Sequence, residues 1–226
     1  NLTLDGTINP DFGQVEADPA EVNLTAFETF FPEQRPFFIE GNQLLQGSGP
    51  GYYYSRRIGA TPQGYATGEV ADSADFLDSP RYATILGAAK LTGRTSSGMS
   101  IGALAAVTQR EYANLYDTST DSFEQVAVEP STAYLVGRIQ QEFGASASTI
   151  GVTLTGLTRS FSDAEPLKQQ MTSQAVSGGA DWLLRMNNGQ FLVGGHAGFS
   201  YIHGSDTAVT AVQTSSAHYY QRPDQD

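Results

Sequence analysis

Carboxylate pairs are the side chains of this chain that could most directly do chemistry, because hydrolysis of a glycosidic bond needs two carboxyl groups held at a fixed gap. The pairs that lie close in sequence are Glu16 with Asp18, Glu21 with Glu28, and Glu33 with Glu40. Closeness in sequence does not set the gap across a site. The pairs therefore do not identify a catalytic site by themselves.

A second interpretation treats the charged side chains as a structural network. Strands that face lipid on one side can keep charge out of lipid only by pointing it inward, where opposite signs pair. We expect such an ion-pair network to fix a plug or to seal the periplasmic end of a barrel, with an ion or ligand path as the alternative. Its members are Glu33, Arg35, Glu40, Arg56, Arg57, Lys90 and Arg94.

Other site chemistries find little support. The three histidines, His196, His203 and His218, lack the spacing of a metal site, and no G-x-S-x-G nucleophile motif occurs. The glycines of Gly47–Gly51 are not followed by the Lys-Ser/Thr of a phosphate loop. Without cysteine the chain can form neither a disulfide nor a Cys-based zinc site. We expect no metal and no cofactor.

Net charge narrows the range of partners. The chain carries 24 acidic and 12 basic residues, for a net charge of −12. Nucleic-acid binding needs a basic surface, so we expect no nucleic acid partner. Cations or a neutral, hydroxyl-rich ligand fit this charge better.

Composition indicates that strands position these side chains. Only 16% of the residues are charged, whereas glycine (24), tyrosine (11) and phenylalanine (12) are plentiful. No run of about 18 apolar residues predicts a membrane-spanning helix. A weak alternation predicts a strand at Leu2–Ile8. A regular succession of strands separated by polar breaks then predicts an antiparallel meander. Its strands are Thr84–Gly93, Gly98–Tyr112, Ser131–Phe143, Ser148–Phe161, Thr172–Met186 and Gln190–His203.

Alternation within the strands favours a membrane barrel. In Ser148–Phe161 the apolar residues Ile150, Val152 and Leu154 share one face, and small or polar residues share the other. Short turns alternate with long polar loops at Tyr112–Pro130 and Phe161–Thr172, as in outer-membrane barrels. Aromatic residues gather near strand ends, as in interfacial girdles. A soluble β-sandwich or open sheet is the alternative, because it would bury the same apolar face.

The chain is expected to divide into three parts. Residues 1–83 hold a strand, an irregular plug-like segment and an acidic loop, and Glu21–Phe31 within them could form a short helix or a bent strand. Residues 84–203 form the all-β antiparallel meander. Residues 204–226 form a long loop, with weak helical periodicity at Ala208–Ala217.

An ordered series of short segments carries a family resemblance over essentially the whole chain. The segments are Asn9-Pro10-Asp11-Phe12, Gln14–Asp18, Phe30–Glu33, Arg35–Phe38, Ser55–Gly59, Ile85–Arg94 and Tyr219–Pro223. They resemble the family known as domain of unknown function 5916. Its members typically carry an N-terminal module similar to carbohydrate-binding family 9, followed by a long antiparallel segment interpreted as an outer-membrane β-barrel.

The resemblance implies a bacterial outer-membrane protein with membrane lipid as its partner and glycan bound through a module outside this chain. We expect the chain to be an internal piece of a longer precursor. Its expected function is that of a non-enzymatic barrel segment serving as a pore, anchor or surface scaffold. Two alternatives stay open: a carbohydrate-active hydrolase, and a structural subunit whose strand edges pair with other protein subunits.

Overall fold

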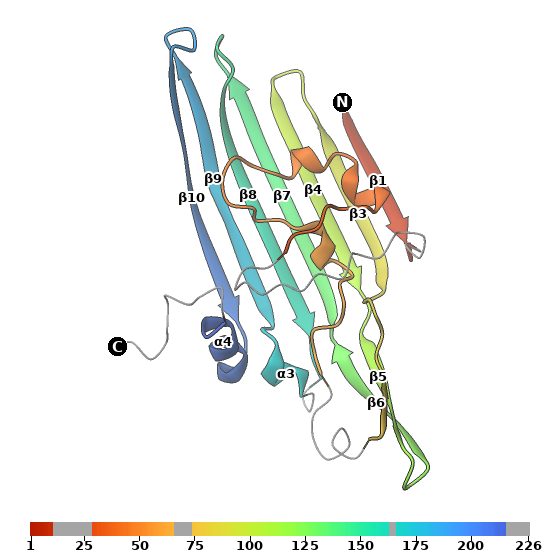
Figure 1. The fold of residues 1–226 in the computed structure, drawn as a ribbon. Helices are drawn as coiled ribbons and strands as arrows, with labels where there is room; N and C mark the ends of the chain where they lie inside the picture. Colours follow the sequence, from red (N-terminus) through yellow and green to blue (C-terminus); the bar gives the residue numbers. More distant parts are fainter. Residues whose placement is uncertain (11–28, 66–73, 163–165, 216–226) are drawn as a thin grey trace, which may run out of the picture.

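The fold is built on one large antiparallel sheet, shown in Figure 1. The computed structural model describes residues 1–10, 29–65, 74–162 and 166–215. Seven strands form the sheet in the order β1-β3-β4-β7-β8-β9-β10, and every neighbouring pair is antiparallel. The strands are β1 (Leu2–Ile8), β3 (Ile85–Arg94), β4 (Met99–Thr108), β7 (Ser131–Phe143), β8 (Ser148–Ser160), β9 (Gln174–Met186) and β10 (Phe191–His203). The sheet is open, since β1 and β10 are its two edges.

A smaller sheet projects from one end of the large one (Figure 1). It contains β2 (Phe76–Asp78), β5 (Glu111–Asp117) and β6 (Ser122–Glu129) in the order β2-β5-β6. We call these three strands the hairpin arm, because β5 and β6 extend the β4–β7 hairpin. The prediction of a long loop at Tyr112–Pro130 is therefore wrong. Ala113 and Leu115 are buried, whereas Tyr112 and Asn114 are exposed, and this alternation forms a strand despite the polar composition.

Residues with positive φ make the tight turns at the other end of the sheet. The β9–β10 turn places Asn187 at φ 50° and Asn188 at φ 55°, and asparagine tolerates this region better than most residues. Gly98 at φ 82° and Gly144 at φ 72° serve the β3–β4 and β7–β8 turns. The short connections thus lie at the end opposite to the hairpin arm.

The two faces of the sheet differ in composition. Cross-strand register sets Leu91, Ala103, Gly137, Leu154 and Phe199 in one row, on what we call the outer face. The neighbouring row on the opposite, inner face contains Lys90, Leu104, Val136, Thr155, Ser177 and Ser200. One face is therefore apolar or small, and the other mixes apolar with polar residues.

A long irregular segment crosses the inner face (Figure 1, orange). This crossing segment, residues 29–65, contains the short helix α1 (Pro36–Ile39) and the 3-10 turns η1 (Asn42–Leu44) and η2 (Ser55–Arg57). Pro36 occupies the first turn of α1, where its missing N–H would have no helical partner anyway.

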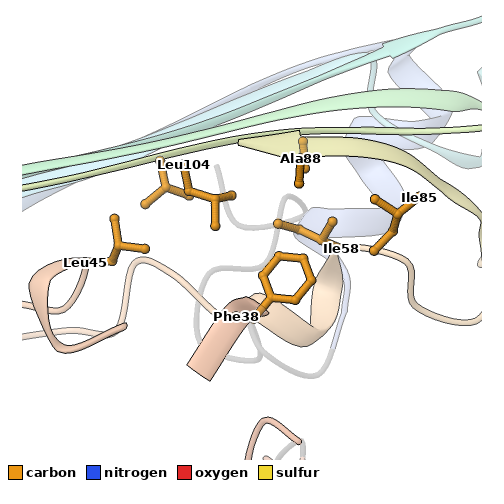
Figure 2. Close-up of a cluster of buried hydrophobic side chains, with 8 residues drawn as sticks. Phe38, Leu45, Ile58, Ile85, Ala88 and Leu104 are labelled. Carbon is orange, nitrogen blue, oxygen red and sulfur yellow. The ribbon is translucent and has the colours of Figure 1, made fainter. Parts of the chain in front are cut away.

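The main core lies between the crossing segment and the inner face, as Figure 2 shows. Phe38, Leu45 and Ile58 of the segment are each no more than 2% exposed. They pack with sheet residues that include Ile85, Ala88, Leu104, Ala106 and Val136. Burying a side chain of this size stabilises by about 1.5–3 kcal/mol. The segment is thus held to the sheet by apolar contacts as well as by the polar contacts described below.

Two helices lie at the end of the sheet that carries the hairpin arm, one after β8 and one after β10. They are α3 (Leu167–Gln170) and α4 (Asp206–Gln213). The Ser205 hydroxyl accepts a hydrogen bond from Ala208 N at 3.2 Å and so caps α4, which covers part of the helical periodicity expected at Ala208–Ala217. Among the described residues no helix has the length and apolar character needed to cross a membrane.

Candidate functional site

A buried ion pair on the inner face is the central feature of the site. Arg138 of β7 and Asp181 of β9 approach to 2.5 Å between Arg138 Nη1 and Asp181 Oδ2, and their side chains are 3% and 10% exposed. Arg138 Nη2 also donates to Asp181 Oδ1 at 2.9 Å, which makes the contact bidentate. Thr153 Oγ1 and Gln140 Oε1 accept from the same guanidinium at 2.7 and 2.8 Å. Both charges are therefore compensated within the sheet.

The crossing segment joins this pair through Ser48. The Ser48 hydroxyl donates to Asp181 Oδ1 at 2.9 Å. Gly47 lies so close that a Cβ there would come within 2.5 Å of Arg138 Nη1, and a Cβ on Gly151 of β8 would come within 2.5 Å of Arg138 Nη2. The guanidinium is thus enclosed between two glycines. We call Ser48, Arg138 and Asp181 the latch.

A second contact of the crossing segment depends on glycines of the sheet. Gly179 and Gly198 are cross-strand partners on β9 and β10. A Cβ on either one would overlap the Tyr52 hydroxyl. The two glycines therefore form a slot in the inner face that receives the Tyr52 ring.

A buried cation fastens the other end of the crossing segment. Lys90 of β3 is 1% exposed, and its Nζ donates to the carbonyl oxygens of Phe37 at 2.6 Å and Glu40 at 2.5 Å. The ammonium also lies 4.9 Å from the centroid of the Phe37 ring. These carbonyls belong to the last turn of α1 and its cap, where a cation is favourable.

An ion pair within the crossing segment holds its two halves together. Arg35 Nη2 lies 2.8 Å from Glu33 Oε2, and Arg35 donates to the carbonyl oxygens of Ser55 at 2.8 Å and Ile58 at 2.6 Å. Burial raises the pKa of Glu33, but hydrogen bonds from Arg35 and Ser55 outweigh it and bring the pKa below its ordinary value of 4.5. Burial, assisted by the Glu33 charge, raises the pKa of the neighbouring Tyr53.

The residues expected to form one network lie in separate places. Glu33, Arg35 and Arg56 come together, since Arg56 Nη1 donates to the Pro32 carbonyl at 2.8 Å. The Arg57 guanidinium lies 6.0 Å from the centroid of the Tyr54 ring. The Glu40 side chain is exposed, and only its carbonyl meets Lys90. Arg94 pairs with Glu142 at 2.8 Å at the short-turn end of the sheet.

Sequence reasoning missed the latch. Arg138 and Asp181 are charged residues near the middle of two predicted strands. That position was the available signal, because a charge in mid-strand needs a partner. Ser48 gave no comparable signal.

The chemistry of the site is that of attachment. Asp181 and Glu33 are each engaged by an arginine, and the carboxylate pairs Glu16 with Asp18 and Glu21 with Glu28 lie outside the described residues. Within the described residues no group of three or more His, Asp or Glu side chains could hold a metal ion. The arrangement fixes the crossing segment against the sheet through two polar contacts, the latch and Lys90, and through the packing of Tyr52 in its slot.

Comparison with known proteins gives one match. A family model described as "Domain of unknown function (DUF5916)" matches residues 1–219. No curated protein matches the chain, and no solved structure does.

Proposed function

This chain belongs to the DUF5916 family, and from that membership and the geometry of the sheet we propose that it is a non-enzymatic segment of an outer-membrane β-barrel. In this proposal the seven-stranded sheet is part of the barrel wall, and the crossing segment is a plug fixed to its lumen side. The segment serves as an anchor or surface scaffold, with its interior occupied rather than open.

The observation that carries the proposal is the exposed apolar outer face. Leu135 and Val152 are each 57% exposed, Phe199 56% and Ile139 54%, and they lie on β7, β8 and β10. Ordinary surfaces of soluble monomers rarely gather so many large apolar side chains over one sheet. Lipid would cover this face, while the polar side chains turn to the covered inner face.

Unpaired strand edges support closure by further strands. The seven strands alternate in direction, so β1 and β10 run the same way. A barrel that is antiparallel throughout needs an even number of strands, and lipid does not tolerate unpaired backbone groups. We therefore infer that an odd number of additional strands, from more of the same polypeptide or from a partner, lies between β10 and β1.

The lengths of the connections suggest an orientation. Outer-membrane barrels have short periplasmic turns and longer extracellular loops. The turns after β3, β7 and β9 are short, whereas the hairpin arm and α3 form longer connections at the opposite end. We assign the hairpin arm to the outside of the cell.

Detergent dependence tests the proposal. The complete precursor should stay monodisperse in detergent micelles and aggregate when detergent is removed, and it should protect the outer face from water-soluble labels in lipid vesicles. Val152→Arg should destabilise the protein folded in vesicles by about 2–4 kcal/mol if that position lies near the bilayer midplane. The matched change Gln125→Arg on the exposed hairpin arm should have little effect. A precursor that is soluble and folded without detergent would overturn the proposal.

A further inference from the structure

The hairpin arm carries a row of three aromatic rings, of which the outer two are exposed. Phe76, Tyr116 and Phe123 are cross-strand neighbours on β2, β5 and β6. Their rings stack, with centroids 6.3 Å apart for Phe76 and Tyr116 and 4.5 Å apart for Tyr116 and Phe123. Phe76 is 63% and Phe123 77% exposed, whereas Ala113 and Leu115 on the opposite side of β5 are buried. An exposed aromatic row on a polar arm marks an interaction site.

A row of polar side chains lies beside the rings on the same side of the arm. Asp78, Asn114 and Gln125 form the next cross-strand row, about 7 Å along the strands, because residues two apart share a face. Gln125 Nε2 donates to Asn114 Oδ1 at 2.9 Å. Within the described part of the chain this leaves Asn114 Nδ2 as a donor and Gln125 Oε1 as an acceptor for a ligand.

From these two rows we propose that the exposed side of the hairpin arm binds a neutral oligosaccharide. A sugar ring has an apolar C–H face that packs on an aromatic ring, and its hydroxyl groups both donate and accept hydrogen bonds. Because β6 is an edge strand of its sheet, Phe123 stacks on one side only among the residues that the structure describes. Its other side is free to receive the sugar, whose hydroxyl groups then reach the Asn114–Gln125 pair.

The charge around the rings selects a neutral ligand. Asp75 and Asp117 lie at the same end of the arm, and Asp121 Oδ1 accepts a hydrogen bond from the Tyr116 hydroxyl at 3.0 Å. These carboxylates repel acidic sugars and phosphorylated lipid headgroups. The amide pair contributes donors and acceptors without charge. A free neutral glycan fits this combination better than an anionic glycan or a lipid headgroup.

The site stands on the geometry of the arm and does not depend on the outer-membrane proposal. If that proposal holds, the arm lies outside the cell, where glycans are met. A soluble protein that binds sugar would overturn the membrane proposal alone. A detergent-dependent protein that does not bind sugar would overturn this inference alone.

Titration calorimetry of the whole chain, in a detergent without a sugar headgroup, tests the site. The probes are cellohexaose, maltohexaose and xylohexaose, and at least one should bind. Phe123→Ala and Asn114→Ala should each weaken that binding at least tenfold, whereas Tyr116→Phe, which keeps the ring, should retain most of it. Phe191→Ala is the matched control, because Phe191 is 61% exposed and lies at the other end of the molecule.

Four results would overturn the inference. The first is that none of the three hexasaccharides binds to the folded protein, with folding verified by circular dichroism. The second is that binding is confined to oligogalacturonate or to vesicles containing lipopolysaccharide. The third is that only tetramethylammonium, a probe for cation binding on aromatic rings, is bound. The fourth is that Phe191→Ala weakens sugar binding as much as Phe123→Ala does.

Discussion

Arg138 and Asp181 form their ion pair across an intervening strand, with 2.5 Å between Arg138 Nη1 and Asp181 Oδ2. Arg138 lies on β7 and Asp181 on β9, and β8 separates them. Gly151 of β8 makes the contact feasible, because a side chain there would occupy the space of the guanidinium. Ser48 then binds the carboxylate from above the sheet. One pair thus links two strands and the crossing segment.

We expect Asp181→Ala to release the crossing segment from the sheet. The change leaves a buried guanidinium without its counter-charge, which costs about 3–5 kcal/mol when one partner of a buried pair is removed. The chain has no cysteine, so Leu45→Cys, at a position 1% exposed, supplies a single buried thiol as a reporter. Thiol labelling of that reporter should become about a hundredfold faster or more, since each 1.4 kcal/mol is a factor of ten.

The matched control for the latch is Glu124→Gln, which removes one exposed carboxylate from the hairpin arm. It should leave the labelling rate within about twofold of the parent. Equal labelling of the Asp181→Ala and Glu124→Gln proteins would show that the latch does not hold the segment.

We expect Gly198→Ala to displace Tyr52 from its slot. The added methyl group would overlap the Tyr52 hydroxyl, and overpacking of this kind costs about 1–3 kcal/mol. Gly194→Ala is the matched control on the same strand and face, where the nearest atom to the new Cβ, Leu183 Cδ1, is 3.4 Å away. Equilibrium unfolding of the two variants measures the difference.

A double-mutant cycle separates the slot from a general effect of the new methyl group. In a Tyr52→Ala background Gly198→Ala should lose most of its cost, because the clash is gone. If Gly198→Ala destabilises the Tyr52→Ala protein as much as it destabilises the parent, the new methyl group does not act through Tyr52.

The sequence predicted much of the strand pattern of the large sheet. Alternation in Ser148–Phe161 and Gln190–His203 predicted β8 and β10 to within a residue at each end. The weak alternation at Leu2–Ile8 predicted β1 with the observed bounds. These elements were accessible because period-two patterning is local and follows from one face being apolar.

Long-range features could not be predicted in the same way. The contact of Arg138 with Asp181 depends on the register of three strands. Ser48, which binds Asp181, lies 133 residues before it in the chain. The strands of the hairpin arm were missed because their exposed face carries Asn114 and Gln125, which read as loop residues. Their buried face is covered by other parts of the chain, since a Cβ on Gly64 would contact Val128.

We expect Lys90→Met to weaken the attachment of α1 to β3. Methionine keeps most of the side-chain volume but leaves the carbonyl oxygens of Phe37 and Glu40 without their donor. Loss of hydrogen bonds to a charged group costs about 1.5–3 kcal/mol. The matched control is Arg94→Met on the same strand, because its pair with Glu142 is exposed and such pairs contribute about 0–1 kcal/mol.

Equilibrium unfolding in detergent measures both changes at β3. If the Lys90→Met protein is as stable as the parent, the cost of burying the Lys90 ammonium equals the stabilisation from its two hydrogen bonds. In that case Lys90 would not serve as an anchor of the segment.

Two glutamates outside the large sheet should give opposite dependences of stability on pH. The pKa of Glu33 is lowered in the folded protein, so its contribution is present above the ordinary value of 4.5 and is lost as pH falls through the folded value. Burial raises the pKa of Glu129, opposed in part by a hydrogen bond from Gln63 N at 3.0 Å. Its contribution is present below 4.5 and is lost as pH rises through the folded value.

Unfolding free energy measured from the acid side of pH 4.5 to neutrality separates the two glutamates. Below 4.5 the parent should gain stability with rising pH through Glu33, and Glu33→Gln should flatten that rise. As pH rises above 4.5, ionisation of Glu129 should lower the free energy of unfolding of the parent. Glu129→Gln removes this loss, so the difference in stability between neutral and acid pH should be more favourable in the variant than in the parent. Each variant serves as the control for the other, because both replace a largely buried carboxylate by an amide of the same shape. A steeper acid-side rise in Glu33→Gln would contradict the pairing of Glu33 with Arg35 as the source of its lowered pKa.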